Sequence, residues 1–305
     1  MNLCILSEAK IRKDSSAALG ITIIVRLFIF KKSVKEVIKM RIGVCIPFDK
    51  LEAAEKLGFD YVEFGASRVY ALSDAEFDAL KARVEKCGIK PECYSGMFPS
   101  GFRLVGKDET PQEQIKEYLH KTFSRIKALR GRLVVFGSSG ARNRDRGYKP
   151  AKAYGELTAN TRLIGNIAAE YGLYIAIEPL NSGETNMINT LREGADLRDA
   201  VGLQNVGLLA DFYHLRKERE DMREVLAVGR LIHVHVARKS GRRYPKRLKE
   251  DCYEDFFNNL KKINYNGGVS IEATASSFKR SSKKAIALLR GLMGRGDEKF
   301  FLKKE

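Results

Sequence analysis

Short apolar runs alternate with longer segments of helical periodicity over most of the chain. Each run is bounded by turn-forming residues, which is typical of a strand in a parallel sheet that helices cover on both faces. The runs lie at residues 41–46, 61–64, 91–95, 133–136, 174–177, 206–210, 231–234 and 268–271. Eight strand–helix units in succession predict an α/β fold that closes into a (β/α)8 barrel, the TIM-barrel architecture.

The amphipathic segments between these runs predict the helices of the barrel. We expect helices at residues 51–57, 74–87, 111–129, 151–171, 190–201, 218–228, 251–263 and 281–293. The predicted barrel therefore occupies residues 40–293 and leaves no segment for another folded domain.

Both ends of the chain differ from this pattern. Residues 1–39 carry eight Lys and Arg against three Asp and Glu, and we interpret them as a poorly ordered N-terminal extension. Their apolar stretch, residues 17–30, contains Arg26 and is shorter than the ~20 residues of a spanning helix, so we expect no membrane segment. Residues 294–305 form a charged tail.

Charge and cysteine usage narrow the functional classes. The 305-residue chain is 44% hydrophobic, enough for a large core, and its formal net charge is +17. Charge of this sign permits anionic partners, but alone it predicts only non-specific, salt-sensitive binding of nucleic acid. The five cysteines include no C-x-x-C pair, which disfavours a zinc ribbon or a disulfide framework and fits a reducing, cytoplasmic setting.

Four successive strands of the second half end in a residue that can bind a metal. The residues are Glu178, Asp211, His235 and Glu272. Their spacings each fit one strand–helix unit, which takes about 30 residues. The carboxyl ends of barrel strands meet at one rim, where such folds place their chemistry. Three carboxylates and an imidazole at that rim predict a site for one divalent cation.

The ligand types favour a hard cation. We expect Mn²⁺, with Mg²⁺, Co²⁺ or Zn²⁺ as alternatives. Any one of the three carboxylates alone is better explained as a helix cap or an ion pair, and only their common register favours a metal site. His233 shares the strand face of His235 but lies one layer deeper, so we expect it to support the site and not to bind the metal.

Several motifs resemble a known superfamily. The segment I-E-P-L-N-x-x-E-T-N-x-I-N-T begins at Ile177, and L-x-D-x-Y-H, H-V-H-V and V-S-I-E follow it. Together they resemble the xylose isomerase-like barrels, and within them most closely the ketose 3-epimerases that act on tagatose and psicose, with hydroxypyruvate isomerase nearby. The resemblance extends over about residues 40–292 and is sharpest across residues 174–272.

The resemblance implies roles for individual residues. It implies that the four strand-end residues bind the metal and that Glu184 and His214 contact substrate hydroxyl groups. It also implies a substrate-binding arginine in the loop after the seventh strand. Arg242 matches that position best, and Arg243 is a substitute. The loop departs from the family pattern by one extra residue and by Lys246 in place of a glycine, which leaves the identity of the sugar open.

The implied reaction is metal-dependent epimerisation of a ketose at C3. A bound cation acts as a Lewis acid on the carbonyl and favours a cis-enediolate. Glu178 and Glu272 come from non-adjacent strands and can lie on opposite faces of the substrate. One then removes the C3 proton and the other returns it, with the roles exchanged in the reverse direction.

Two loops near the predicted rim are strongly basic. We consider two interpretations, a solvated surface, which is the commoner case, or a site for a phosphorylated or carboxylated sugar. The residues concerned are Arg142, Arg144, Arg146, Arg238, Lys239, Arg242, Arg243, Lys246 and Arg247.

Three other functions compete with epimerisation. Apurinic endonucleases share the fold, but their three-zinc site needs about five histidines, whereas this chain has four in all. Inosose and dehydroshikimate dehydratases keep the metal and the enolate but expel a hydroxyl group. A sugar-binding barrel without activity is disfavoured because all four ligand positions are intact. We therefore expect a small sugar substrate, no specific nucleic-acid partner, and a homodimer or homotetramer as in related enzymes.

Overall fold

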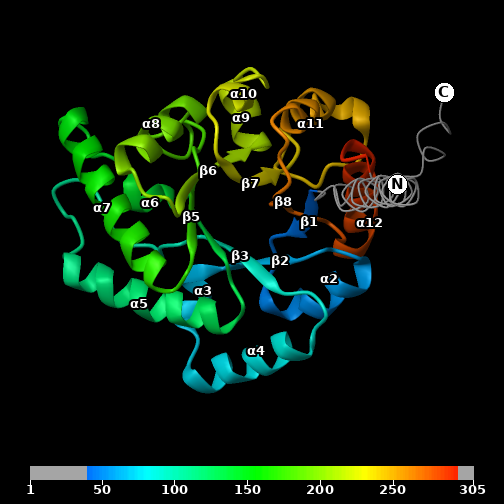
Figure 1. Ribbon diagram of the computed structural model, residues 1–305, viewed down its shortest axis with the longest axis horizontal. Helices are drawn as coiled ribbons and strands as arrows, with labels where there is room; N and C mark the ends of the chain where they lie inside the picture. Colours follow the sequence, from blue (N-terminus) through cyan, green and yellow to red (C-terminus); the bar gives the residue numbers. More distant parts are fainter. Residues whose placement is uncertain (1–39, 295–305) are drawn as a thin grey trace, which may run out of the picture. The chain divides into compact units, whose positions relative to one another are not determined.

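Each apolar run of the sequence forms a strand, and the eight strands form one parallel sheet (Figure 1). The structure is a computed structural model that describes residues 40–294. The strands are β1 (Arg41–Val44), β2 (Val62–Gly65), β3 (Pro91–Ser95), β4 (Leu133–Phe136), β5 (Tyr174–Ile177), β6 (Val206–Asp211), β7 (Leu231–Val236) and β8 (Gly268–Ile271). The predictions for residues 1–39 and for the tail from residue 295 lie outside the described range.

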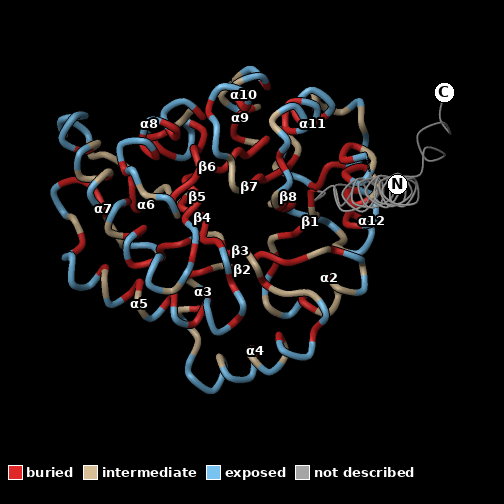
Figure 2. The backbone as a smooth tube through the Cα atoms, in the orientation of Figure 1, coloured by how far each residue is buried: buried red, intermediate tan, exposed pale blue. Residues whose placement is uncertain are grey.

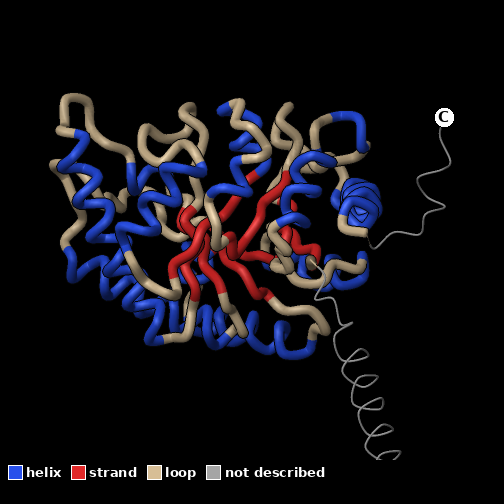
Figure 3. The backbone as a smooth tube through the Cα atoms, turned by 45° about the horizontal axis from the view of Figure 1, so that its top comes forward, coloured by secondary structure: helices blue, strands red, loops and turns tan. Residues whose placement is uncertain are grey.

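The sheet curls into a nearly closed barrel. Its strand order is β1-β8-β7-β6-β5-β4-β3-β2, so the first and last strands are neighbours. Between β1 and β2 the contact is an isolated bridge from Cys45 to Glu63, supported by a 3.0 Å hydrogen bond from Ile46 N to Glu63 O. Figure 3 shows the strands at the centre with the helices around them. The predicted TIM barrel is confirmed.

The outer layer consists of the helices that connect the strands. Two of them begin with a capping box, Ser73 with Glu76 on α4 and Thr190 with Glu193 on α8, which satisfies the free N–H groups of the first turn. The helices are α2 (Leu51–Leu57), α3 (Ala66–Ala71), α4 (Asp74–Lys86), α5 (Gln112–Ala128), α6 (Ser139–Arg142), α7 (Pro150–Glu170), α8 (Leu191–Val201), α9 (Phe212–Glu218), α10 (Glu224–Ala227), α11 (Tyr253–Lys262) and α12 (Phe278–Leu292), with 3₁₀ turns η1 (Phe48–Lys50) and η2 (Leu248–Glu250).

The prediction of a single helix at residues 218–228 is wrong. Two short helices, α9 and α10, occupy this region instead, and α9 begins directly after β6. The reason is that the Asp211 side chain accepts a hydrogen bond from Tyr213 N and so caps a helix at the strand end. Arg219, in the left-handed conformation with φ of 61°, then stops it. The hydrophobic pattern also did not predict helix α3.

Two layers of buried side chains hold the barrel together. The larger lies between strands and helices, and Figure 2 shows buried backbone along the strands and exposed backbone on the outer helix faces. The smaller fills the interior and includes Tyr61, Cys93 and Leu209. Gly43 and Gly268 make room for Tyr61, because a Cβ on either would lie within 2.4 Å of its ring or hydroxyl.

Among residues 40–294, no helix has both the length and the apolar character needed to cross a membrane.

Candidate metal centre and active site

The side chains at the ends of four successive strands meet at the carboxyl end of the barrel. One donor atom from each lies within 4.8 Å of the donors of the other three, and the residues are Glu178, Asp211, His235 and Glu272. His235 Nδ1 is 3.0 Å from Glu178 Oε1 and 3.3 Å from Glu272 Oε2. The structure thus brings together the four residues at which the sequence predicts a metal site.

This donor set suits a divalent cation. Three carboxylates and one imidazole are the oxygen-rich ligands that Mn²⁺ and Mg²⁺ accept. Burial, with Glu272 nearby, raises the pKa of Glu178, and burial raises that of Asp211 to about 7 in spite of Arg242. Raised pKa values mean that the charges of these two carboxylates are poorly stabilised by the protein alone. The pKa of Glu272 is lowered, because His235 and Arg242 outweigh the effect of burial. A cation at their centre would offset this cost, so the residues present fit the metal.

Glycine beside Glu178 leaves space for its carboxylate. A Cβ on Gly137, which follows β4, would lie 1.9 Å from Glu178 Oε2 and 3.0 Å from its Cδ. Any side chain at position 137 would therefore displace the carboxylate. The lack of a side chain at Gly137, after β4, therefore leaves space for the Glu178 carboxylate, after β5.

His214 points an unused donor toward the cluster. Its Nδ1 accepts a 3.0 Å hydrogen bond from Asn181 N, which puts the ring proton on Nε2. Nε2 is buried, 3.5 Å from Asp211 Oδ2, and has no hydrogen-bond partner among the described residues. Burial, with Arg242 nearby, lowers the His214 pKa to about 3, so the ring is neutral. A neutral N–H of this kind can donate to a substrate oxygen.

Arg242 connects three carboxylates of the rim. Its Nη2 pairs with Glu272 and lies 3.5 Å from Asp211 Oδ2, while Nη1 lies 3.5 Å from Glu184 Oε1. The guanidinium also lies over the Tyr213 ring, 4.7 Å from its centroid. Arg242 has a positive φ of 45°, an uncommon conformation for a non-glycine residue, at the tip of this loop.

Glu184 and Arg243 complete the predicted substrate contacts. Glu184 accepts a 2.8 Å hydrogen bond from Asn181 Nδ2, so Asn181 links it to His214. The Arg243 side chain is exposed, and its carbonyl accepts a hydrogen bond from Arg238 N. Of the two candidate arginines, the geometry therefore favours Arg242.

Comparison with known proteins identifies the lineage of this site. The family model described as the xylose isomerase-like TIM barrel matches residues 51–292, most of the chain. The chain belongs to the xylose isomerase-like TIM barrel family. The predicted resemblance is thereby confirmed at the level of the family.

Relatives of this family member include named sugar epimerases. D-psicose 3-epimerase of Agrobacterium fabrum is 27% identical over 234 residues, 73% of this chain and 77% of that protein. L-ribulose 3-epimerase of Methylomonas sp. is 36% identical over 138 residues, which cover 43% of this chain and 48% of that protein. A crystal structure of D-psicose 3-epimerase in the presence of D-fructose has a TM-score of 0.73 at 22% identity, covering 84% and 100% of the two chains, and supports the fold.

One member of the basic rim is not on the surface. The prediction that groups Arg142 with solvated or anion-binding residues is wrong, because this side chain is fully buried. It donates hydrogen bonds to Phe136 O at 3.2 Å and to Glu178 O at 2.7 Å, and so joins the ends of β4 and β5. Its fixed charge is held by backbone carbonyls, and burial lowers its pKa to about 10. The exposed basic side chains of these loops are Arg146, Lys239, Arg243, Lys246 and Arg247.

Sequence reasoning missed Glu63, the buried carboxylate of β2. Its Oε1 lies 3.1 Å from His235 Nε2, and its Oε2 lies 3.0 Å from His233 Nε2. His233 therefore lies behind the donor cluster, as predicted, and is not one of its donors. A signal was present in the run Y-V-E-F, because a carboxylate inside a fully buried strand is almost never left without a partner.

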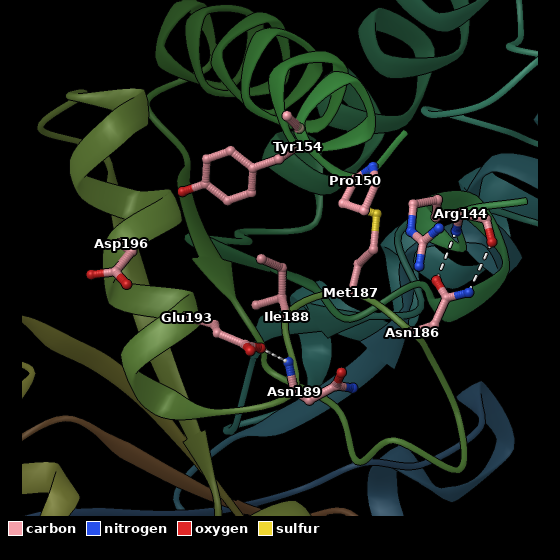
Figure 4. Close-up of a pocket in the computed structure, with 10 residues that line it drawn as sticks. Arg144, Pro150, Tyr154, Asn186, Met187, Ile188, Asn189, Glu193 and Asp196 are labelled. Atoms are coloured by element: carbon pink, nitrogen blue, oxygen red, sulfur yellow. Dashed lines mark hydrogen bonds between the residues drawn. The ribbon is translucent and has the colours of Figure 1, made fainter. Parts of the chain in front are cut away.

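A hollow of about 470 Å³ lies beside the loop that follows β5 (Figure 4). Its wall includes Ile188, a β-branched residue with a positive φ of 60°, whose carbonyl accepts a hydrogen bond from Leu180 N. The lining residues are Arg144, Pro150, Ala151, Tyr154, Asn186, Met187, Ile188, Asn189, Glu193 and Asp196. Of the residues singled out in the sequence, only Arg144 of the basic loops lines it, and none of the predicted metal, catalytic or substrate-binding residues does. We assign it no part in the chemistry.

Proposed function

We propose that this protein is a divalent-metal-dependent sugar isomerase or epimerase and that its reaction is 3-epimerisation of a ketose. One observation carries the proposal: Glu178 and Glu272, from the non-adjacent strands β5 and β8, face a common centre with Asp211 and His235. The names of the relatives, which are epimerases of psicose and ribulose, support the class of reaction.

The four clustered residues would hold the metal. A divalent cation bound there supplies Lewis acidity, which polarises the carbonyl of a ketose and acidifies the proton on the neighbouring carbon. Mn²⁺ is the ion that we propose, with Mg²⁺, Co²⁺ and Zn²⁺ as alternatives, because the donors are mainly carboxylate oxygens.

Two carboxylates would move the proton. Glu178 Oε1 and Glu272 Oε2 lie 3.0 and 3.3 Å from His235 Nδ1. We infer that a bound substrate presents one face to each carboxylate. One carboxylate removes the C3 proton and gives an enediolate, and the other delivers a proton to the opposite face. The configuration at C3 is then inverted, and in the reverse direction the two groups exchange roles.

Three further side chains would hold the sugar. The His214 Nε2–H is buried, neutral and without an acceptor in the described part of the chain, so it can donate to a substrate oxygen. Arg242 can stabilise the negative charge that develops on the substrate oxygens. Glu184, 3.5 Å from Arg242 and bonded to Asn181, can accept from a hydroxyl group.

Solvent-deuterium exchange tests this function. The protein is stripped with a chelator, reloaded with Mn²⁺, and incubated in D₂O with psicose, tagatose, fructose, ribulose, sugar phosphates, hydroxypyruvate and inososes. We expect deuterium at C3 of a ketose together with the epimer, and no exchange in chelator. Loss of water from an inosose in place of exchange would show a dehydratase. Full Mn²⁺ occupancy without exchange into any ketose would contradict the proposal.

A further inference from the structure

Glu63 is a carboxylate buried in the interior of the barrel, where charge is costly. Its side chain is fully inaccessible, and Tyr61, two residues before it and just ahead of β2, is one of the side chains that fill the interior. β2 is three strands from β7 around the closed barrel, so no local sequence pattern couples Glu63 to the histidines. A buried carboxylate without hydrogen-bond donors would destabilise the fold. The structure supplies two donors, and both are imidazoles.

The two imidazoles belong to one strand and approach the same carboxylate. His235 Nε2 lies 3.1 and 3.3 Å from the two Glu63 oxygens, and His233 Nε2 lies 3.0 Å from Oε2. The rings are one strand period apart on β7 and meet edge to face with centroids 5.0 Å apart. An ionised carboxylate only accepts hydrogen bonds, so each ring must place a proton on Nε2.

The position of that proton decides what His235 can do. With the proton on Nε2, the lone pair of Nδ1 is directed at the cluster, 3.0 Å from Glu178 Oε1 and 3.3 Å from Glu272 Oε2. A ring with its proton on Nδ1 would present a donor there and could not bind a cation. The acceptor behind the ring thus selects the face that can act as a ligand.

The other hydrogen bonds around His233 also agree with a proton on Nε2 of the imidazole rings. His233 Nδ1 faces the Cys93 thiol at 3.9 Å, a weak donor, which suits a ring protonated on Nε2. Ser270 Oγ lies 3.3 Å from His233 Nε2 and 2.9 Å from the Tyr61 hydroxyl. These side chains bond to His233 and make no side-chain hydrogen bond to His235. Among the described residues, Glu63 is the side chain whose oxygens lie within hydrogen-bond distance of His235 Nε2, and Cys45 Sγ lies within 4.8 Å of donor atoms of both.

The backbone of β2 fixes where this carboxylate lies. The pairing of β2 with β3 slips between Val62 and Glu63, so that Glu63 lies opposite Cys93. The same residue closes the barrel, because it forms the bridge to Cys45 and its carbonyl accepts the bond from Ile46 N. The position of Glu63 is thus set by barrel closure and not by a flexible loop.

We propose that Glu63 is the positioning residue of the metal centre: its carboxylate accepts the Nε2 proton of His235 and thereby holds Nδ1 free to bind the cation. The inference rests on the proposed metal site. Because the outer partner of a metal-bound histidine contributes about 10–100-fold to metal affinity, the effect is measurable as Mn²⁺ binding without any substrate.

Two substitutions at position 63 and one control test the proposal. Glu63→Leu removes the acceptor at similar volume, and Glu63→Gln keeps one acceptor oxygen without the charge. We expect the Mn²⁺ dissociation constant, measured by calorimetry, to rise about 10–100-fold for Leu and less for Gln. Ser270→Ala removes a hydroxyl that bonds to His233 and to Tyr61 but makes no side-chain hydrogen bond to His235. We expect its Mn²⁺ affinity to stay within about twofold of wild type, since most effects of outer groups act through the ligand that they touch.

A spectroscopic measurement separates positioning from a general loss of packing. The chain has only four histidines, so ¹⁵N-histidine labelling gives few imidazole signals. In the Zn²⁺-loaded wild type we expect His235 to show a protonated Nε2 and a metal-bound Nδ1. In Glu63→Gln, we expect the Nε2 proton to exchange faster with solvent while the His214 signals stay unchanged.

The outcomes are distinguishable. Equal Mn²⁺ affinity of wild type and both folded variants would overturn the role of Glu63 and leave the metal site intact. A Ser270→Ala variant as weak as Glu63→Leu would overturn it too, because the effect would then follow from any damage to the interior. If Glu63→Leu fails to fold, the Glu63→Gln affinity and its histidine spectrum decide. A wild type that binds no Mn²⁺ removes the proposed function and this inference together.

Discussion

The two halves of the barrel differ in how they contribute to the rim. Strands β5 to β8 each end in a side chain whose donor atom reaches the common centre. Strands β2 to β4 give no donor to that cluster, and yet residues on β2 and after β4 determine its shape. Gly137 leaves space for Glu178, Arg142 of α6 binds the Glu178 carbonyl, and Glu63 contacts the back of His235. In one half, the type of residue at each strand end indicates its role at the site. In the other half, residues affect the site through buried contacts, and sequence motifs do not reveal such contacts.

The largest effect is expected in the half that supplies donors. Glu272→Gln keeps the shape of the side chain but removes a carboxylate that we propose as a base and a metal ligand. We expect C3 deuterium exchange to fall by about 10³-fold or more at saturating Mn²⁺, since a positioned acid or base contributes about 10²–10⁴-fold. Far-ultraviolet circular dichroism should stay unchanged. Glu113→Gln, on an exposed side chain of α5, is the control. Unchanged exchange in Glu272→Gln would remove its role in proton transfer.

An added methyl group at Gly137 tests the half of the barrel that contributes buried contacts and no donors. Gly137→Ala puts a Cβ 1.9 Å from Glu178 Oε2, so the carboxylate has to move. We expect about a 10²-fold loss of kcat, because displacing a reacting group by about 1 Å has that consequence. Gly140→Ala, in α6 three residues later, is a matched control, since nothing lies within 4 Å of its added methyl. If both variants retain full activity, Gly137 has no part in placing Glu178, and the comparison of the two halves fails at that point.

The same contrast explains what the sequence could predict. The sequence could predict the four clustered residues, because topology alone brings the carboxyl ends of parallel strands to one rim. These residues are Glu178, Asp211, His235 and Glu272. The sequence could not predict the burial of Arg142, because exposed neighbours such as Arg146 are arginines in the same loop region. Only the contact of Arg142 with backbone carbonyl groups distinguishes the two.

Two other errors have local causes. The predicted helix at 218–228 failed because Asp211 serves both as a strand-end carboxylate and as the cap of α9, and helical periodicity does not register a cap that lies inside a strand. The role of Glu63 depends on the shifted pairing of β2 with β3 and on closure of the barrel between β1 and β2. Neither register nor closure can be read from the hydrophobic pattern of a single strand.

A smaller effect is expected from the loop after β7. Arg242→Lys keeps the charge but replaces a planar group that reaches Glu272 and Glu184 with different nitrogens. We expect KM to rise about tenfold, with a smaller change in kcat, from the loss of about one charged hydrogen bond worth ~1.5 kcal/mol. Arg243→Lys, next in sequence and exposed, should leave both constants unchanged. A stronger effect at position 243 than at 242 would reverse our choice of substrate-binding arginine.

The smallest effect comes from a carboxylate of the same half that lies outside the cluster. Burial raises the pKa of Glu220 to about 7, although the carboxylate accepts a bond from Leu191 N. The protonated form is favoured in the folded state, so its stabilising effect is complete below the ordinary pKa of about 4.5 and is lost as pH rises through 7.

Glu220→Gln should abolish this pH dependence. Between pH 5 and 8 the wild type should lose about 1 kcal/mol of unfolding free energy relative to the variant, a value reduced for partial solvent screening. Urea unfolding at both pH values measures it, with the exposed Glu254→Gln as control and with C3 exchange unchanged in both. Parallel pH profiles for wild type and Glu220→Gln would mean that burial alone does not raise carboxylate pKa values in this half of the barrel. The raised value at Asp211 would then have to come from the neighbouring charges of the cluster.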